Sequence, residues 1–126
     1  MSQYRVRTPE PRSRLSQALA QVMNETRQRQ LEAEKEGFPA LEHLICVAQG
    51  HSGQSHHLRR LLLALYNGDS WPFEMQRLRG LDPALQADAL AVIQMATYSG
   101  HEIHTFIEGG DALLKRFWEI EEAKDE

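Results

Sequence analysis

Apolar residues recur every three or four positions along most of this chain, which is the spacing of amphipathic α-helices. The clearest case is residues 53–66, in which four leucines share one helical face: Leu58, Leu61, Leu62 and Leu65. The opposite face combines His56, Arg60 and Leu63, so we expect a mixed apolar and basic surface exposed to water there. Such a surface is typical of a partner contact.

The first part of the chain predicts a long helix over residues 13–36, capped by Ser13. Its first half has an apolar stripe, but after Met23 nearly every residue is polar, so part of this helix should project from the domain. Gly37 predicts its end, and Pro39 predicts the start of a second helix.

Asp82 followed by Pro83 is typical of a helix start, and the segment 84–98 is apolar almost all round. We therefore expect it to be the central helix, and a homodimer is an alternative if other segments leave it uncovered. No stretch alternates like a strand. The pattern predicts an all-α bundle of five or six helices with a long, partly projecting first helix. Residues 13–126 form one domain in this interpretation, after a flexible basic arm of residues 1–12.

The length and the net charge of the chain limit the classes of function it can have. The 126 residues suit a single domain, and the net charge of −4 argues against general affinity for nucleic acid. Cys46 is the only cysteine, so no intrachain disulfide can form. Neither a signal peptide nor a membrane-spanning segment is recognisable, and we expect a cytoplasmic protein.

The candidate chemistry is weak. His101 and His104 are three residues apart near Glu102 and Glu108, a spacing that could bind a metal ion on one helical face. The motif of a zinc protease is absent, and no nucleophile has a catalytic context. We therefore expect no enzymatic activity, no metal site and no cofactor, with a histidine-based metal protein or enzyme as the weakest alternative.

Charged residues are better candidates for a functional role, as contacts with a partner, than the histidines are as metal ligands. The predicted partner-binding residues lie in the basic arm, on the projecting helix and on the mixed face of residues 53–66: Arg5, Arg7, Arg12, Arg14, Arg27, Arg29, His56, Arg59, Arg60 and Leu63. In a second interpretation, the arm and the helix of residues 53–66 bind nucleic-acid phosphates, and the protein is an accessory protein of a mobile element.

Several local motifs carry a resemblance. They are Gly53-Gln54-Ser55 with the leucine-rich helix after it, Tyr66-Asn67, residues 78–82, and Glu102-Ile103-His104 followed by residues 106–110. Over residues 40–118 the chain resembles an uncharacterised domain family of proteobacterial plasmids and integrative conjugative elements.

The resemblance implies a gene context and no activity. In that context we expect a small protein that binds a host protein complex and has no direct contact with membranes. The most specific hypothesis is an anti-CRISPR inhibitor that binds a host RNA-guided surveillance complex.

Overall fold

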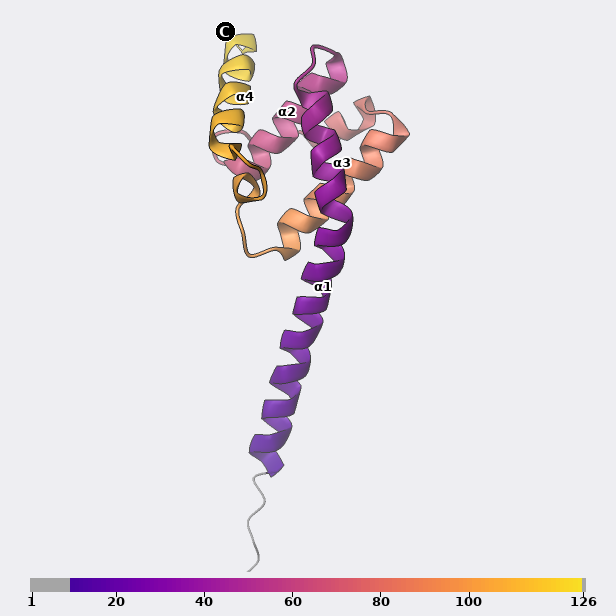
Figure 1. The fold of residues 1–126 in the computed structure, drawn as a ribbon, viewed down its shortest axis with the longest axis vertical. Helices are drawn as coiled ribbons and strands as arrows, with labels where there is room; N and C mark the ends of the chain where they lie inside the picture. Colours follow the sequence, from indigo (N-terminus) through magenta and orange to yellow (C-terminus); the bar gives the residue numbers. More distant parts are fainter. Residues whose placement is uncertain (1–9, 126) are drawn as a thin grey trace, which may run out of the picture.

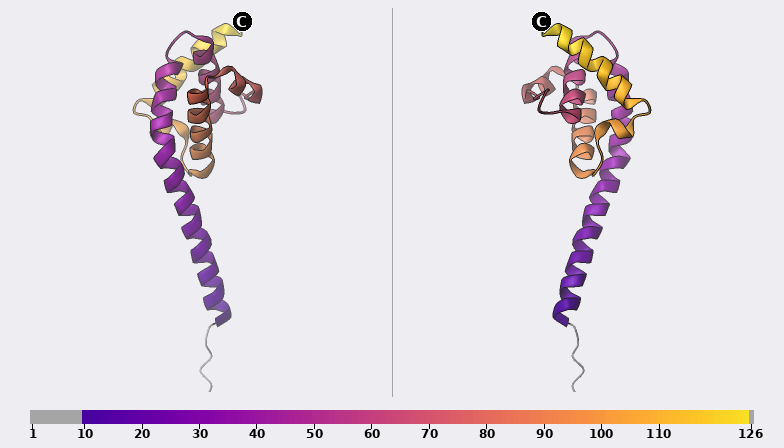
Figure 2. Two further views of the ribbon diagram at one scale, coloured as in Figure 1. Left: turned by 90° about the vertical axis from the view of Figure 1, so that its right-hand side faces the viewer. Right: turned by 90° about the vertical axis from the view of Figure 1, so that its left-hand side faces the viewer.

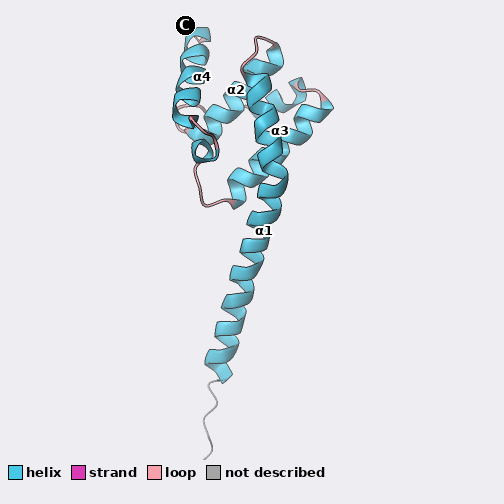
Figure 3. Ribbon diagram, in the orientation of Figure 1, coloured by secondary structure: helices cyan, strands magenta, loops and turns pink. Residues whose placement is uncertain are grey.

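The computed structural model describes the backbone of residues 10–125 and the side chains of residues 14–125. In that range the chain forms four α-helices and two 3₁₀ helices, without a strand (Figures 1 and 3). The order is α1 (Glu10–Ala48), α2 (Gly53–Tyr66), η1 (Met75–Gly80), α3 (Pro83–Tyr98), η2 (Ile103–Phe106) and α4 (Gly110–Lys124). The predicted all-α fold with a long first helix is confirmed.

The predicted break in the first helix is wrong. α1 begins at Glu10, before Ser13, and runs through both Gly37 and Pro39 to Ala48. Gly37 is buried against Met95 of α3, so this glycine allows two helices to approach closely and does not end one. Pro39 lies on the exposed side, and packing of the residues around it against the body outweighs its lost backbone hydrogen bond.

Half of α1 packs in a compact body and half extends out of it (Figure 1). α3 lies along the inner half of α1, as both side views in Figure 2 show. α2 contacts α1, α3, α4 and both 3₁₀ helices. The central helix is therefore α2, and our expectation for residues 84–98 is wrong: α3 buries one face on α1 and leaves Leu90 exposed.

Side chains of all four α-helices fill the core. The fully buried apolar residues include Leu44, Ala48, Leu58, Leu62, Leu63, Ala89, Val92, Met95, Leu114 and Phe117. Two predicted helix starts are confirmed, because Asp82 accepts a hydrogen bond from the Leu85 amide and Ser52 accepts one from the Ser55 amide. The last helix differs: it is preceded by Gly109 in the left-handed conformation and has no side-chain cap.

Among residues 10–125, no helix is both long and apolar enough to cross a bilayer.

Candidate functional site

The outer part of α1 is the largest uncovered feature of the fold. Every residue from 14 to 29 is exposed, and the first buried residue of α1 is Ala33. At about 1.5 Å per residue, the helix from Arg14 to Ala33 extends about 29 Å. We call residues 14–29 the projecting segment. Its exposure confirms that part of the first helix projects.

The projecting segment has an exposed apolar stripe. Leu15 is 70% exposed and Leu19 is 59% exposed, and Val22 and Met23 are exposed to a similar degree. The stripe continues the core-facing side of α1, since Leu19, Ala33 and Ala40 are separated by multiples of seven residues, close to two helical turns. Within the body this side is covered, and in the projecting segment the same side is bare.

Arginines flank the stripe. The projecting segment contains Arg14, Arg27 and Arg29 with a single acidic residue, Glu25, so it is basic in an acidic protein. Glu25 accepts a hydrogen bond from Gln21, and the Arg29 guanidinium lies 6.0 Å from the Tyr98 ring centre at the edge of the body. Apolar surface with basic neighbours is suited to a protein surface that is apolar and rimmed by carboxylates.

A buried ionic cluster joins α2 to α4. Glu121 is completely buried, and its carboxylate accepts hydrogen bonds from Arg59 Nε at 2.7 Å and Arg60 Nε at 2.8 Å. Arg59 also donates to the carbonyl groups of Ala48 and Gly50, so it ties the end of α1 to the cluster. The Nε and Nη1 donors of Arg59 therefore have structural partners.

Histidines extend the cluster toward the surface. His56 Nδ1 lies 2.6 Å from a Glu121 oxygen, without the alignment of a hydrogen bond. Arg77 Nη1 lies 3.2 Å from a ring nitrogen of both His56 and His57, and Arg77 pairs with Glu74. Polar contacts thus run from Glu74 through Arg77 and His56 to Glu121.

The cluster shifts several pKa values. Burial alone would raise the pKa of Glu121, but hydrogen bonds from Arg59 and Arg60 outweigh it and lower the pKa. Burial, reinforced by the positive charge of Arg77, lowers the pKa of His57. The hydrogen bond from Arg60 lowers the pKa of Asp125. Glu121 is thus a carboxylate in the folded protein.

The structure corrects the prediction for four of the ten predicted contact residues. Leu63 is 0% exposed and Arg59 is 2% exposed, while His56 and Arg60 are partly buried. α2 is covered on several sides, so it has no water-facing side made of these residues. The predicted surface of His56, Arg59, Arg60 and Leu63 is therefore wrong as an exposed patch.

The remaining predicted contacts fall in two groups. Arg5 and Arg7, with most of the predicted arm, lie outside the described residues, as does the side chain of Arg12. Arg14, Arg27 and Arg29 are exposed on the projecting segment, as expected.

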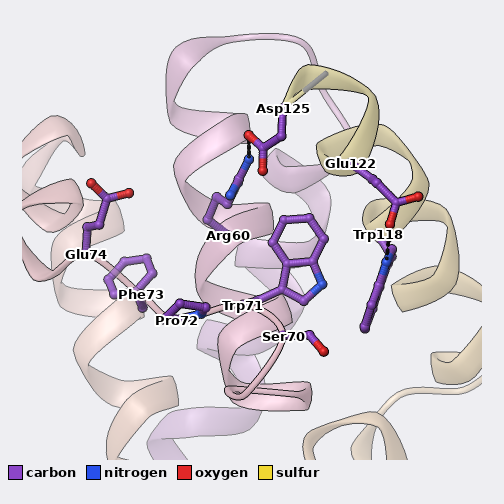
Figure 4. Close-up of a pocket in the computed structure, with 9 residues that line it drawn as sticks. All are labelled: Arg60, Ser70, Trp71, Pro72, Phe73, Glu74, Trp118, Glu122 and Asp125. Carbon is purple, nitrogen blue, oxygen red and sulfur yellow. Dashed lines mark hydrogen bonds and ion pairs between the residues drawn. The ribbon is translucent and has the colours of Figure 1, made fainter.

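An open pocket lies between α2, the loop of residues 67–74 and α4 (Figure 4). Its walls include the rings of Trp71, Phe73 and Trp118, and Arg60 and Asp125 lie at one end. Trp71 and Trp118 meet edge to face with ring centres 5.4 Å apart. Trp71 itself is buried in the core, and nothing in the sequence indicated the pocket beside it.

The paired histidines pack against aromatic rings. His104 packs edge to face on Tyr66, and exposed His101 lies against Phe106. Among the residues that the structure describes, no three His, Cys, Asp or Glu side chains converge on a point suited to a metal ion. The packing on Tyr66 and partial burial support a structural role for His104.

The conserved pattern of a family of unknown function, DUF7673, matches residues 38–122. The chain belongs to the DUF7673 family. No curated protein and no solved structure matches it. The DUF7673 match includes the pocket residues from Arg60 to Glu122 and the Glu121 cluster, and it begins inside α1 at Phe38. The projecting segment therefore lies ahead of the DUF7673 match.

Sequence reasoning missed Glu121 and the tryptophan pocket. Glu121 belongs to an acidic carboxyl end that has the composition of a solvated tail. One signal was available: its spacing from Leu114 and Phe117 puts it on the buried side of α4, where a carboxylate needs cationic partners.

Proposed function

We propose that this protein functions by binding a partner protein through the projecting segment, without catalysing a reaction. The observation that carries the proposal is the exposed stripe of Leu15, Leu19 and Val22, which continues the packing side of α1 beyond the body. Contiguous exposed apolar residues mark interaction surfaces in soluble proteins. The occupant we propose is an apolar, acid-rimmed surface, such as an amphipathic helix of the partner.

We propose the identity of the partner from the sequence resemblance. If the chain serves a mobile element, its target is a host defence complex, and our most specific candidate is an RNA-guided surveillance complex that the protein inhibits as an anti-CRISPR. The small size, the mixed charge and the projecting segment support this candidate. Arg59 and Arg60 are committed to Glu121, which weakens the alternative in which α2 binds nucleic-acid phosphates.

The test is capture of a surveillance complex by the tagged protein from a bacterial host that carries one, with and without nuclease. Wild-type protein should retain the complex subunits in stoichiometric amounts after nuclease treatment, and should protect invading DNA from interference. Capture that disappears with nuclease would favour the nucleic-acid alternative.

Matched variants locate the contact. Leu19→Glu with Val22→Glu places two charges in the stripe and should abolish capture without changing stability, because both residues are exposed. Leu90→Glu changes a leucine of α3 that is 58% exposed, and it should bind like the wild type. Equal capture by all three proteins contradicts a contact through the projecting segment.

A further inference from the structure

The pocket beside Trp71 has the walls of a cation site. Its volume is about 740 Å³, and its aromatic side chains come from two separate segments, with Trp71 and Phe73 in the loop and Trp118 on α4 (Figure 4). The faces of aromatic rings carry partial negative charge and attract cations. The fold already shows this preference here, because the Arg60 guanidinium lies 4.7 Å from the ring centre of Trp71.

The charges around the pocket favour the same class of ligand. Three carboxylates line it, those of Glu74, Glu122 and Asp125, and Arg60 is the only cation of the lining, although Glu74 also pairs with Arg77 beside it. Arg60 is neutralised by its bonds to Glu121 and Asp125. Glu122 accepts a hydrogen bond from Trp118 Nε1 at 3.0 Å and has no ion pair among the described residues. An anionic ligand would meet a surplus of negative charge.

A buried donor gives a second indication. Trp71 is only 6% exposed, and its indole nitrogen has no hydrogen-bond acceptor. Figure 4 shows this nitrogen on the side of the ring nearest Trp118, between the two indole rings that line the pocket. A buried N–H without an acceptor is uncommon in folded proteins. A ligand that brings a carbonyl group to the two indoles would satisfy it.

We propose that this pocket binds an arginine side chain of a peptide, with the guanidinium stacked on the partly exposed ring of Trp118 and paired with Glu122. The planar guanidinium suits both interactions, since it stacks on aromatic faces and donates paired hydrogen bonds to a carboxylate. The main chain of the same peptide supplies a carbonyl acceptor for Trp71. The site is separate from the projecting segment, so each proposal can fail while the other stands.

The two tryptophans make the test direct. They are the only two in the chain and both line the pocket, so tryptophan emission reports on binding at this site. The probe is the tripeptide acetyl-Gly-Arg-Gly-amide, compared with the same peptide carrying citrulline, which is neutral and nearly the same shape. We expect a saturable emission change with the arginine peptide that weakens as salt rises, and none with the citrulline peptide.

Two single variants complete the design. Glu122→Gln keeps an oxygen that can accept from Trp118 and removes the charge, so affinity for the arginine peptide should fall about two- to fivefold. Glu119→Gln removes an exposed charge from the same helix outside the pocket and should leave affinity unchanged. Equal responses to the two peptides, equal affinities of the two variants, or no saturable response would each overturn the proposal.

Discussion

Glu121 shows how strongly one residue can depend on its surroundings. Its carboxylate is fully buried, and the charge is tolerable only because Arg59 and Arg60 donate to it. Removing one member of such a cluster leaves the other charges buried without a partner, which costs more than the cluster itself contributes.

Glu121→Gln should therefore lower the free energy of unfolding by about 3 kcal/mol. Urea denaturation of the variant beside Glu119→Gln, which removes an exposed charge from the same helix, measures the difference. The control should lie within about 0.5 kcal/mol of the wild type. Equal stability of both variants would show that the cluster is not held as described.

His57 predicts a pH dependence of stability. Its pKa is lowered in the fold by burial and by Arg77, so below about pH 6.5 the unfolded chain binds more protons than the folded one. Stability contributed by neutral His57 should be complete above that pH and decrease as the pH falls through it. Protonation would also remove the ring nitrogen that accepts from Arg77.

Urea denaturation between pH 8 and pH 5.5 tests this, with His57→Gln expected to show a shallower decrease than the wild type. His101→Gln changes an exposed histidine and should retain the full decrease. If the stability of His57→Gln decreased with falling pH as steeply as that of the wild type, the pH dependence would belong to another group.

Residue-level prediction from sequence succeeded where the cause is local. Asp82 and Ser52 cap their helices through amides three residues away, and such short-range patterns are visible in the sequence. Leu63 and Arg59 were assigned to water because no local pattern shows that α4 returns to cover α2. The partner of Arg59 is 62 residues away.

At the scale of the element, α1 shows tertiary packing outweighing local propensity. Gly37 and Pro39 together predict a break between two helices, yet one helix continues through both. Neither signal reveals that Met95 of α3 lies against position 37. The sequence thus predicts the helical segments well and their continuity poorly.

Gly37→Ala should consequently destabilise the protein, by about 1–3 kcal/mol, although alanine is the better helix former. The added Cβ would lie 2.6 Å from both Cβ and Sδ of Met95, so α1 and α3 would have to move apart. Gly53→Ala is the control, because at that position the Cβ meets nothing within 4 Å. In thermal unfolding, the Tm of Gly37→Ala should fall, whereas the Tm of Gly53→Ala should rise or stay unchanged. A stabilised Gly37→Ala would contradict the close approach.

At the scale of the whole molecule, the compact body and the projecting segment should behave independently. Residues 14–29 are all exposed, so deleting residues 1–28 removes few of the contacts that the structure describes. We expect the shortened chain to unfold within about 0.5 kcal/mol of the full chain while losing its capture of a partner. A large loss of stability that depends on protein concentration would instead indicate a homodimer formed through this segment.

The continuity of α1 has a geometric consequence for whatever the projecting segment binds. A flexible linker would let the body drift around its anchor, but an unbroken helix sets both the distance and the direction between the two. The body would then lie about 29 Å from the bound surface, at the far end of a rigid helix. In that position the body excludes other macromolecules from a volume much larger than the area of the contact itself. A small contact could therefore obstruct a large complex.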